Sequence, residues 1–157
     1  MNKNGYGVIE VTVAAGLASV IALSIFQLVV ATGRPVSAGA RQTEATYLAE
    51  EALEAVRVLR NDSWSNEIAP LSNNTVYYPV KIATDWTLTT TPPAPINSLY
   101  TRTIQLQAVY RDANDDISAS GTLDPKTRKV TATVTWPERG QAKTITLDTY
   151  LTNFLGT

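Results

Sequence analysis

Two residue types are missing from this chain of 157 residues, which contains no cysteine and no histidine. Without cysteine there is no disulfide, no thiol nucleophile and no thiolate metal ligand. Without histidine the chain lacks the commonest general base and the commonest metal-binding side chain. No arrangement of serine, aspartate or glutamate in the sequence suggests a catalytic set either. We therefore expect a protein that is not an enzyme, with no catalytic residue, no cofactor and no metal ligand.

An excess of charge of one sign is also missing. The 13 basic residues are balanced by 14 acidic ones, which gives a formal net charge of −1. A dedicated nucleic-acid-binding protein normally has a basic surplus, so this balance argues against a nucleic-acid partner. Lys126, Arg128 and Lys129, with Arg139 and Lys143 on the next hairpin, are interpreted as a solvated strand edge rather than as a DNA-binding patch.

Residues 11–31 carry no formal charge and are mostly apolar. A helix of about 21 residues at ~1.5 Å per residue is roughly 31 Å long, which matches a hydrocarbon core ~30 Å thick. A secretory signal peptide is one alternative, but its apolar core usually has only ~7–15 residues. A plain signal anchor is a second alternative. The run predicts a membrane-spanning helix, and Gly16 with its neighbouring alanines suits close packing against other helices.

Glu10 lies at the N-terminal edge of this apolar run. A carboxylate beside lipid is costly unless it finds a positive partner. One interpretation is a simple carboxylate among the lipid headgroups. The other is a residue that pairs with a new α-amine, made at Tyr6 by cleavage after Gly5.

A second helical stretch is predicted after Gly33, Arg34 and Pro35. Proline removes a backbone donor and clashes with the preceding turn, so we expect a kink or an unwound patch near Pro35. Beyond it, apolar residues recur at three- and four-residue spacing and form one stripe along a helix. The members of this stripe are Ala45, Leu48, Ala49, Ala52, Val56 and Leu59.

The rest of the chain has the composition of β-strands. Four strands are predicted, at residues 76–89 (interrupted by Pro79), 102–110, 130–136 and 143–151. Alternating apolar and polar residues predict an antiparallel sheet with one solvated face, and the helical stripe is the expected cover of the other. The fold class is therefore α+β.

Alternation also assigns the side chains of these strands to faces. In the second strand the residues expected to share one face are Ile104, Leu106, Ala108 and Tyr110. The tryptophans, Trp64, Trp86 and Trp136, are interpreted as core residues together with the tyrosines.

The loop 112–124 opens with Asp112, Asn114 and Asp116 in the spacing of a calcium-binding loop. The pattern then fails, because Ile117 stands where the sharp turn needs glycine. We interpret this loop as a solvated turn.

The segment from Gly5 to Glu10, followed by an apolar helix, resembles the processing region of type IV prepilins and type II secretion pseudopilins. In that family a short basic leader ends in glycine, an aromatic residue or methionine follows, and a glutamate comes five residues after the cut. Lys3 supplies the leader charge here, and Tyr6 is the expected new N-terminus. Tyr6 replaces the commoner phenylalanine, and Gly7 stands where threonine is usual.

A second match lies in the predicted second helical stretch. The sequence Thr-Tyr-Leu-Ala-Glu-Glu-Ala-Leu-Glu-Ala-Val-Arg at residues 46–57 is similar to a segment of minor pilins and pseudopilins of the V and I types. The two matches cover the first 60 or so residues of the chain.

The resemblance implies a type IV pilin-like fold. A long N-terminal hydrophobic helix with a kink near Pro35 would pack its second half on a four-stranded antiparallel sheet. The implied parts are a leader peptide (1–5), a membrane and filament-core helix (6–33), the second half of the helix (34–62) and a β-sheet headpiece (63–157).

The resemblance also implies a function and partners. A prepilin peptidase would cut between Gly5 and Tyr6 and N-methylate Tyr6, and Glu10 would meet the Tyr6 amine of a neighbouring subunit. The chain would cross the bacterial cytoplasmic membrane once, with its headpiece outside the cytoplasm. An assembly platform would then add it to an extracellular filament of copies of itself or of a major pilin. The alternative is a membrane-anchored extracellular binding module that does not polymerise.

Overall fold

The computed structural model describes the backbone of residues 4–154 and the side chains of residues 7–30 and 38–154. The chain divides into two compact units, Met1–Arg41 and Gln42–Thr157. The described part of the first unit is helix throughout. The second contains the last part of the same helix and all of the sheet, so the fold is α+β as expected.

One helix, α1 (Asn4–Asp62), accounts for the N-terminal 59 residues of the described fold. It is helical through residues 33–35, so the expectation of an unwound patch there was wrong. A proline removes only one hydrogen bond from a long ladder, and the turns on either side can keep the helix intact. A bend at Pro35 stays a prediction.

Within the second unit, α1 buries the stripe predicted from the sequence. Ala45, Ala49, Ala52 and Val56 are fully buried, Leu59 is 3% exposed, and Leu48 is partly buried against the same cluster. They form one core cluster with residues of the sheet. Three alanines along this stripe leave room for the helix to lie close to the strands.

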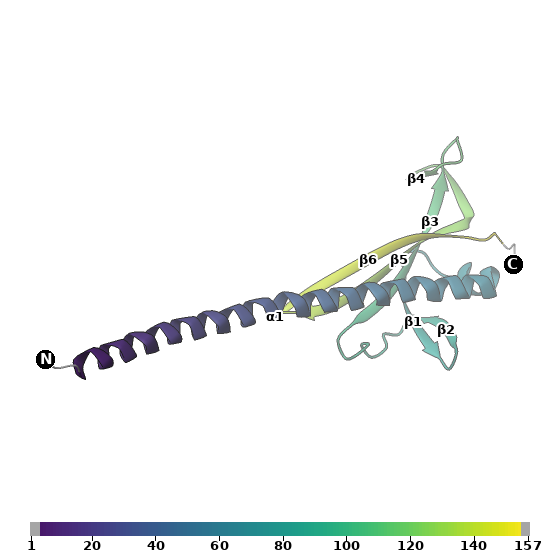
Figure 1. The fold of residues 1–157 in the computed structure, drawn as a ribbon. Helices are drawn as coiled ribbons and strands as arrows, with labels where there is room; N and C mark the ends of the chain where they lie inside the picture. The colour runs from purple at the N-terminus through teal and green to yellow at the C-terminus, as the bar shows by residue number, and fades with distance from the viewer. Residues whose placement is uncertain (1–3, 155–157) are drawn as a thin grey trace. The chain divides into compact units, whose positions relative to one another are not determined.

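The sheet has six antiparallel strands rather than the four expected (Figure 1). Five are arranged in the order β2-β1-β3-β5-β6, and β4 pairs with the end of β3. The strands are β1 (Val76–Ile82), β2 (Asp85–Thr89), β3 (Thr101–Arg111), β4 (Ile117–Ser118), β5 (Thr122–Glu138) and β6 (Gln141–Thr152).

The first predicted strand is in fact the hairpin of β1 and β2. Its tight turn contains Ala83 with a φ of 56°, where the usual turn residues glycine and asparagine are missing. Pro79 lies inside β1 and pairs with Leu88, so it does not interrupt the strand. β1 pairs with β3 only at Val76 and Tyr77, and at Pro79 it therefore has a partner on one side alone, where a missing N–H is tolerated.

The alternation predicted for residues 130–136 is confirmed. Val130, Ala132, Val134 and Trp136 are all buried in the core, and the threonines between them lie on the other face. Trp64, in the short π-helical segment η1 (Trp64–Ile68), is buried as well.

The alternation predicted for β3 holds only as far as Leu106. The pairing of β3 with β5 shifts between Ala108 and Val109, and residues 125–127 of β5 have no partner on β3. Beyond this bulge Val109 is buried, whereas Tyr110 is 38% exposed. The expectation that Tyr110 faces the core was therefore wrong: beside the bulge, which inserts its extra residues in β5, the end of β3 no longer keeps the burial pattern of residues 102–106.

The hairpin of β5 and β6 is regular from Thr127 to Glu138. Its two-residue turn consists of Arg139 (φ 52°) and Gly140 (φ 78°), both in the left-handed region. Two such residues form the turn type that fits the twist of a hairpin. Pro137 and Glu138, just before the turn, are the last two residues of β5.

Candidate functional site

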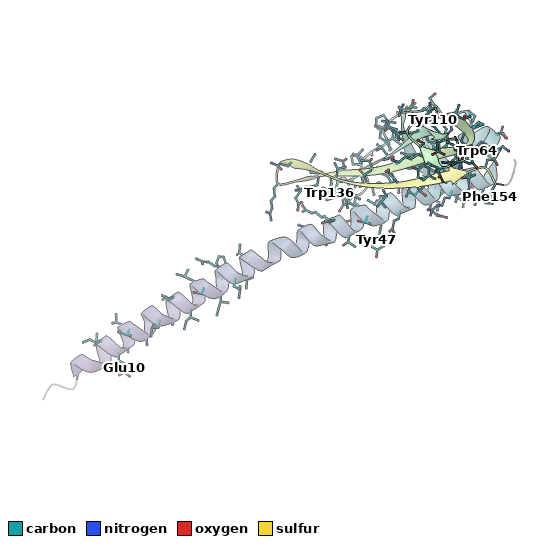
Figure 2. All side chains as sticks on the ribbon, turned by 90° about the horizontal axis from the view of Figure 1, so that it is seen from above. Glu10, Tyr47, Trp64, Tyr110, Trp136 and Phe154 are labelled. Carbon is teal, nitrogen blue, oxygen red and sulfur yellow. The ribbon has the colours of Figure 1, made fainter. Side chains whose placement is uncertain are left out.

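The first unit offers one feature of functional interest, the apolar segment Gly7–Val30 of α1. Its 24 residues are long and apolar enough to cross a membrane, and none of this segment is buried inside the chain. Figure 2 shows its side chains along the helix, with Glu10 near the N-terminal end. Among the described residues, α1 is the one helix that contains a segment long and apolar enough to cross a membrane.

The large apolar side chains of this segment are open to whatever surrounds the chain. From Val8 to Val29 their exposed fractions lie between 56% (Val13) and 68% (Val8). Apolar surface in water costs about 25 cal/mol for each Å², and soluble proteins rarely leave so large a continuous patch uncovered. The segment is therefore suited to apolar surroundings such as lipid.

The hydroxyl groups of the segment are already satisfied by the helix. Each donates a hydrogen bond to the carbonyl oxygen four residues earlier, which removes the cost of bringing a free hydroxyl into lipid. The pairs are Thr12 with Val8 (2.8 Å), Ser19 with Ala15 (2.7 Å) and Ser24 with Val20 (2.8 Å).

Glu10 is the only formally charged residue between Gly7 and Val30, and it is exposed. It has no ion-pair partner among the residues that the structure describes. Gly5 and Tyr6 are helical, so the predicted cleavage point lies in the first turns of α1. The side chain of Tyr6 lies outside the described residues, and its predicted pairing with Glu10 is a contact between subunits that one chain does not display.

Sequence reasoning missed a polar cluster inside the second unit. Arg102 on β3 is only 8% exposed and forms an ion pair with Glu51 of α1. Its guanidinium also lies 5.3 Å from the ring centre of Trp86 and donates to the carbonyl of Pro79 at 3.3 Å. The sequence did contain a sign that Arg102 is buried. Arg102 lies two residues before Ile104 on the same strand, so alternation places its side chain on the same buried face.

A second link joins the same part of α1 to the loop before β3. The carboxylate of Glu44 accepts hydrogen bonds from the Asn97 amide and the Tyr100 hydroxyl, each at 2.8 Å. Asn97 has a positive φ of 51°, so the loop is held in a conformation that few residue types adopt readily. Glu44 thus fixes this loop against the helix.

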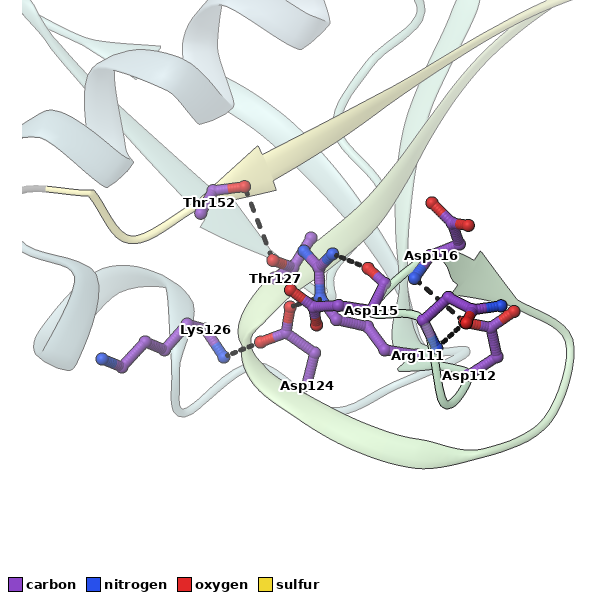
Figure 3. Close-up of polar contacts among 9 residues, drawn as sticks. Arg111, Asp112, Asp115, Asp116, Asp124, Lys126, Thr127 and Thr152 are labelled. Atoms are coloured by element: carbon purple, nitrogen blue, oxygen red, sulfur yellow. Dashed lines mark hydrogen bonds and ion pairs between the residues drawn. The ribbon is translucent and has the colours of Figure 1, made fainter.

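The acidic loop between β3 and β5 is organised around its own backbone (Figure 3). Oδ1 of Asp112 accepts the backbone N–H groups of Asn114 (2.8 Å) and Asp116 (3.1 Å). Asp124 accepts from Nε of Arg111 at 2.8 Å. Among the described residues no group of three or more acidic side chains is placed to hold a metal ion.

The Arg111–Asp124 contact shifts both groups. The hydrogen bond from Arg111 lowers the pKa of the Asp124 carboxyl below its ordinary value. The same hydrogen bond raises the pKa of Arg111. Each partner therefore favours the charged form of the other.

Two of the basic residues that were weighed as a DNA-binding patch make separate contacts within the chain. Lys129 pairs with Asp148 at 2.9 Å, which raises the pKa of Lys129 and lowers that of Asp148. Arg128 donates to the Asn73 side chain and to the carbonyl of Ala69. These contacts give the two side chains structural roles within the headpiece.

The described residues thus define a class of protein: an α+β chain with an N-terminal helix able to span a membrane. Comparisons with protein-family models, with curated proteins and with solved structures found no match for this chain.

Proposed function

We propose that this chain is a structural subunit, of the minor type, in a type IV pilus or pseudopilus. The observation that carries the proposal is Gly7–Val30, an apolar helix that the chain leaves uncovered and in which Glu10 is the only charge. A helix of this kind serves as a membrane anchor before assembly and as the core of a filament afterwards.

Processing after Gly5 would come first. A prepilin peptidase at the cytoplasmic membrane would cut the bond to Tyr6 and N-methylate the new amine. That bond lies in helical backbone between two glycines, Gly5 and Gly7. Glycine costs about 1 kcal/mol relative to alanine inside a helix, so this first turn opens readily for a peptidase.

Glu10 would then select the position of the subunit in the filament. In a low-dielectric helix bundle a carboxylate without a partner is strongly unfavourable, and the methylated amine of Tyr6 on a neighbouring subunit supplies the opposite charge. The pair would therefore fix the axial register of each incoming helix.

Packing between helices would supply the rest of the cohesion. A Cβ atom added at Gly7 or Gly16 would meet nothing within 4 Å in this chain, so neither glycine is needed for contacts of its own helix. Small residues on a membrane helix allow another helix to approach closely. The partners would be copies of this chain or of a major pilin, delivered by an assembly platform, with the headpiece outside the cytoplasm.

The test is mass spectrometry of the N-terminus, followed by an incorporation assay. The mature chain from its native host is expected to begin at N-methylated Tyr6. Replacing Glu10 with alanine is expected to leave processing intact and to abolish recovery of the subunit in sheared filaments. Glu67→Ala removes an exposed carboxylate of the headpiece and serves as the matched control, with normal incorporation.

Two results would overturn the proposal. An unprocessed start at Met1 in a peptidase-competent host would favour a membrane-anchored binding module that does not polymerise. Normal amounts of the Glu10→Ala subunit in filaments would remove the role assigned to the carboxylate.

A further inference from the structure

We propose that the headpiece carries a binding site for a neutral saccharide, in an open hollow on the solvent face of the sheet. The hollow has a volume of about 520 Å³, within the range of known ligand sites. Its polar lining includes Asn74, Gln107, Tyr110, Ser118, Lys129 and Tyr150. The site lies wholly in the second unit and does not depend on polymerisation through α1.

The floor of the hollow is one row of side chains across three strands. Gln107 of β3 pairs with Lys129 of β5, which pairs in turn with Tyr150 of β6. Their chain neighbours Leu106, Val130 and Leu151 are buried in the core. Since successive side chains of a strand point to opposite faces, the row of three faces away from α1.

Tyr110 lies in the wall of the hollow, next to a bulge in the pairing of β3 with β5. The bulge is formed by residues 125–127 of β5, which have no partner on β3. Tyr110 is partly exposed and lies opposite Ser118 of β4; Figure 2 labels it in the headpiece. Bulges are common beside binding sites.

Asn74 also lines the hollow, and its backbone is held by hydrogen bonds. Its φ is 59°, in the left-handed region. Its backbone N–H donates to the carbonyl of Leu106 at 2.8 Å, and its carbonyl accepts from the side chain of Gln105 at 2.8 Å. With the backbone held at both ends, the carboxamide is left for another partner. Strained backbone fixed in this way is typical of ligand-binding positions.

The charges in the hollow favour a neutral ligand. Of the described residues that line it, Lys129 alone is basic, and it is held by Asp148 at 2.9 Å. Asp148 also accepts from Thr131 at 2.7 Å, so both of its oxygens are engaged. None of the same lining residues carries a carboxylate side chain. A phosphate or a nucleic acid would meet one cation that is already paired, which is poor recognition for an anion.

The remaining groups fit the chemistry of a sugar. Two tyrosine rings offer flat apolar surfaces that end in a hydroxyl group. Asn74 and Gln107 offer both donors and acceptors in their carboxamides, and Ser118 adds a hydroxyl. A saccharide presents C–H faces for the rings and hydroxyl groups for the amides, whereas an open polar hollow holds a purely apolar ligand weakly.

The test uses the full chain in a zwitterionic detergent, because glycoside detergents would compete for the site. An array of neutral oligosaccharides, with sialylated and sulfated ones beside them, identifies the best neutral probe for titration. The unmodified chain is expected to bind a neutral oligosaccharide. Tyr150→Ala and Gln107→Ala are each expected to raise the Kd for this oligosaccharide by about tenfold or more. The first variant loses one ring contact and the second one amide contact with the sugar.

Two further variants separate binding from folding. Thr146→Ala lies on the same strand and face as Tyr150 but outside the lining, and it is expected to bind as the unmodified chain does. Tyr150→Phe keeps the ring and is expected to retain most of the affinity lost in Tyr150→Ala. No binding of any neutral oligosaccharide, binding of anionic ones alone, or an equal loss in Thr146→Ala would each overturn the proposal.

Discussion

Two stretches of the same helix behave in opposite ways. In Gly7–Val30 the apolar side chains are exposed on every side, whereas in residues 42–62 the apolar stripe is buried against the sheet. Leu17 is 61% exposed and Leu59 is 3% exposed, although both sit in regular α-helix. The difference lies in the cover: the second stretch finds its apolar cover within the chain, whereas the described residues leave the first uncovered.

The pattern of residues reflects this division. A stripe on one side, with charges on the other, suits a helix that meets one sheet, as in residues 42–62. A helix that is apolar all round suits surroundings that are apolar on every side. The backbone is common to both stretches, so side chains alone decide which surroundings each part of α1 requires.

The largest expected effect sharpens this comparison with matched leucines. Leu59→Ala removes a buried side chain from the core and is expected to lower the free energy of unfolding of the headpiece by about 2–5 kcal/mol. Leu17→Ala removes the same atoms from the exposed stretch and is expected to leave headpiece unfolding unchanged. Chemical denaturation of the full chain in detergent, followed by tryptophan fluorescence, measures both. A large loss from Leu17→Ala would break the comparison.

The next effect concerns the polar contacts of the buried stretch. Arg102→Ala empties a buried position and leaves Glu51 and the Pro79 carbonyl without their donor. We expect a loss of about 2–4 kcal/mol in unfolding free energy. The matched control is Arg57→Ala, which breaks the exposed pair with Glu54 and is expected to cost less than about 1 kcal/mol. Equal losses of unfolding free energy in the two variants would show that burial does not determine how much each ion pair contributes to stability.

The smallest effect is a dependence on pH confined to the headpiece. The pKa of Asp124 is lowered in the folded chain from its ordinary 3.8, so this carboxylate stabilises the fold above that pH. The contribution is lost as the pH falls from 3.8 through the lower folded pKa, because the folded chain then binds its proton as well.

Asp124→Asn tests this dependence. The unfolding temperature of the variant is expected to lie below that of the unmodified chain by a constant amount at neutral pH, and the gap is expected to shrink in acid. Thermal unfolding from about pH 7 to about pH 2 measures it. A gap that widens toward acid would contradict a lowered pKa for Asp124 in the folded chain, and Asp62→Asn, at an exposed residue, provides the control.

Local patterns determined much of this protein. The length and composition of the apolar run were sufficient to predict a helix able to cross a membrane, and spacing was sufficient to predict the buried stripe of α1. The faces of β5 followed from strict alternation. Each of these features depends on the residue pattern within one helix or one strand, and that pattern can be read directly from the sequence. The cleavage point at Gly5 and Tyr6 and the role of Glu10 rest on resemblance and stay predictions.

Tertiary structure decided what depends on two elements meeting. The turn at Ala83 carries no glycine or asparagine, so the split of one predicted strand into β1 and β2 is set by pairing across the sheet. The bulge of β5 opposite Ala108 and Val109 arises from the pairing of β3 with β5, and Tyr110 lines the hollow beside it. Arg102 is buried because Glu51 comes to it from a distant part of the chain. Such contacts join residues that are far apart in the sequence, so they cannot be predicted from the residue pattern within one segment.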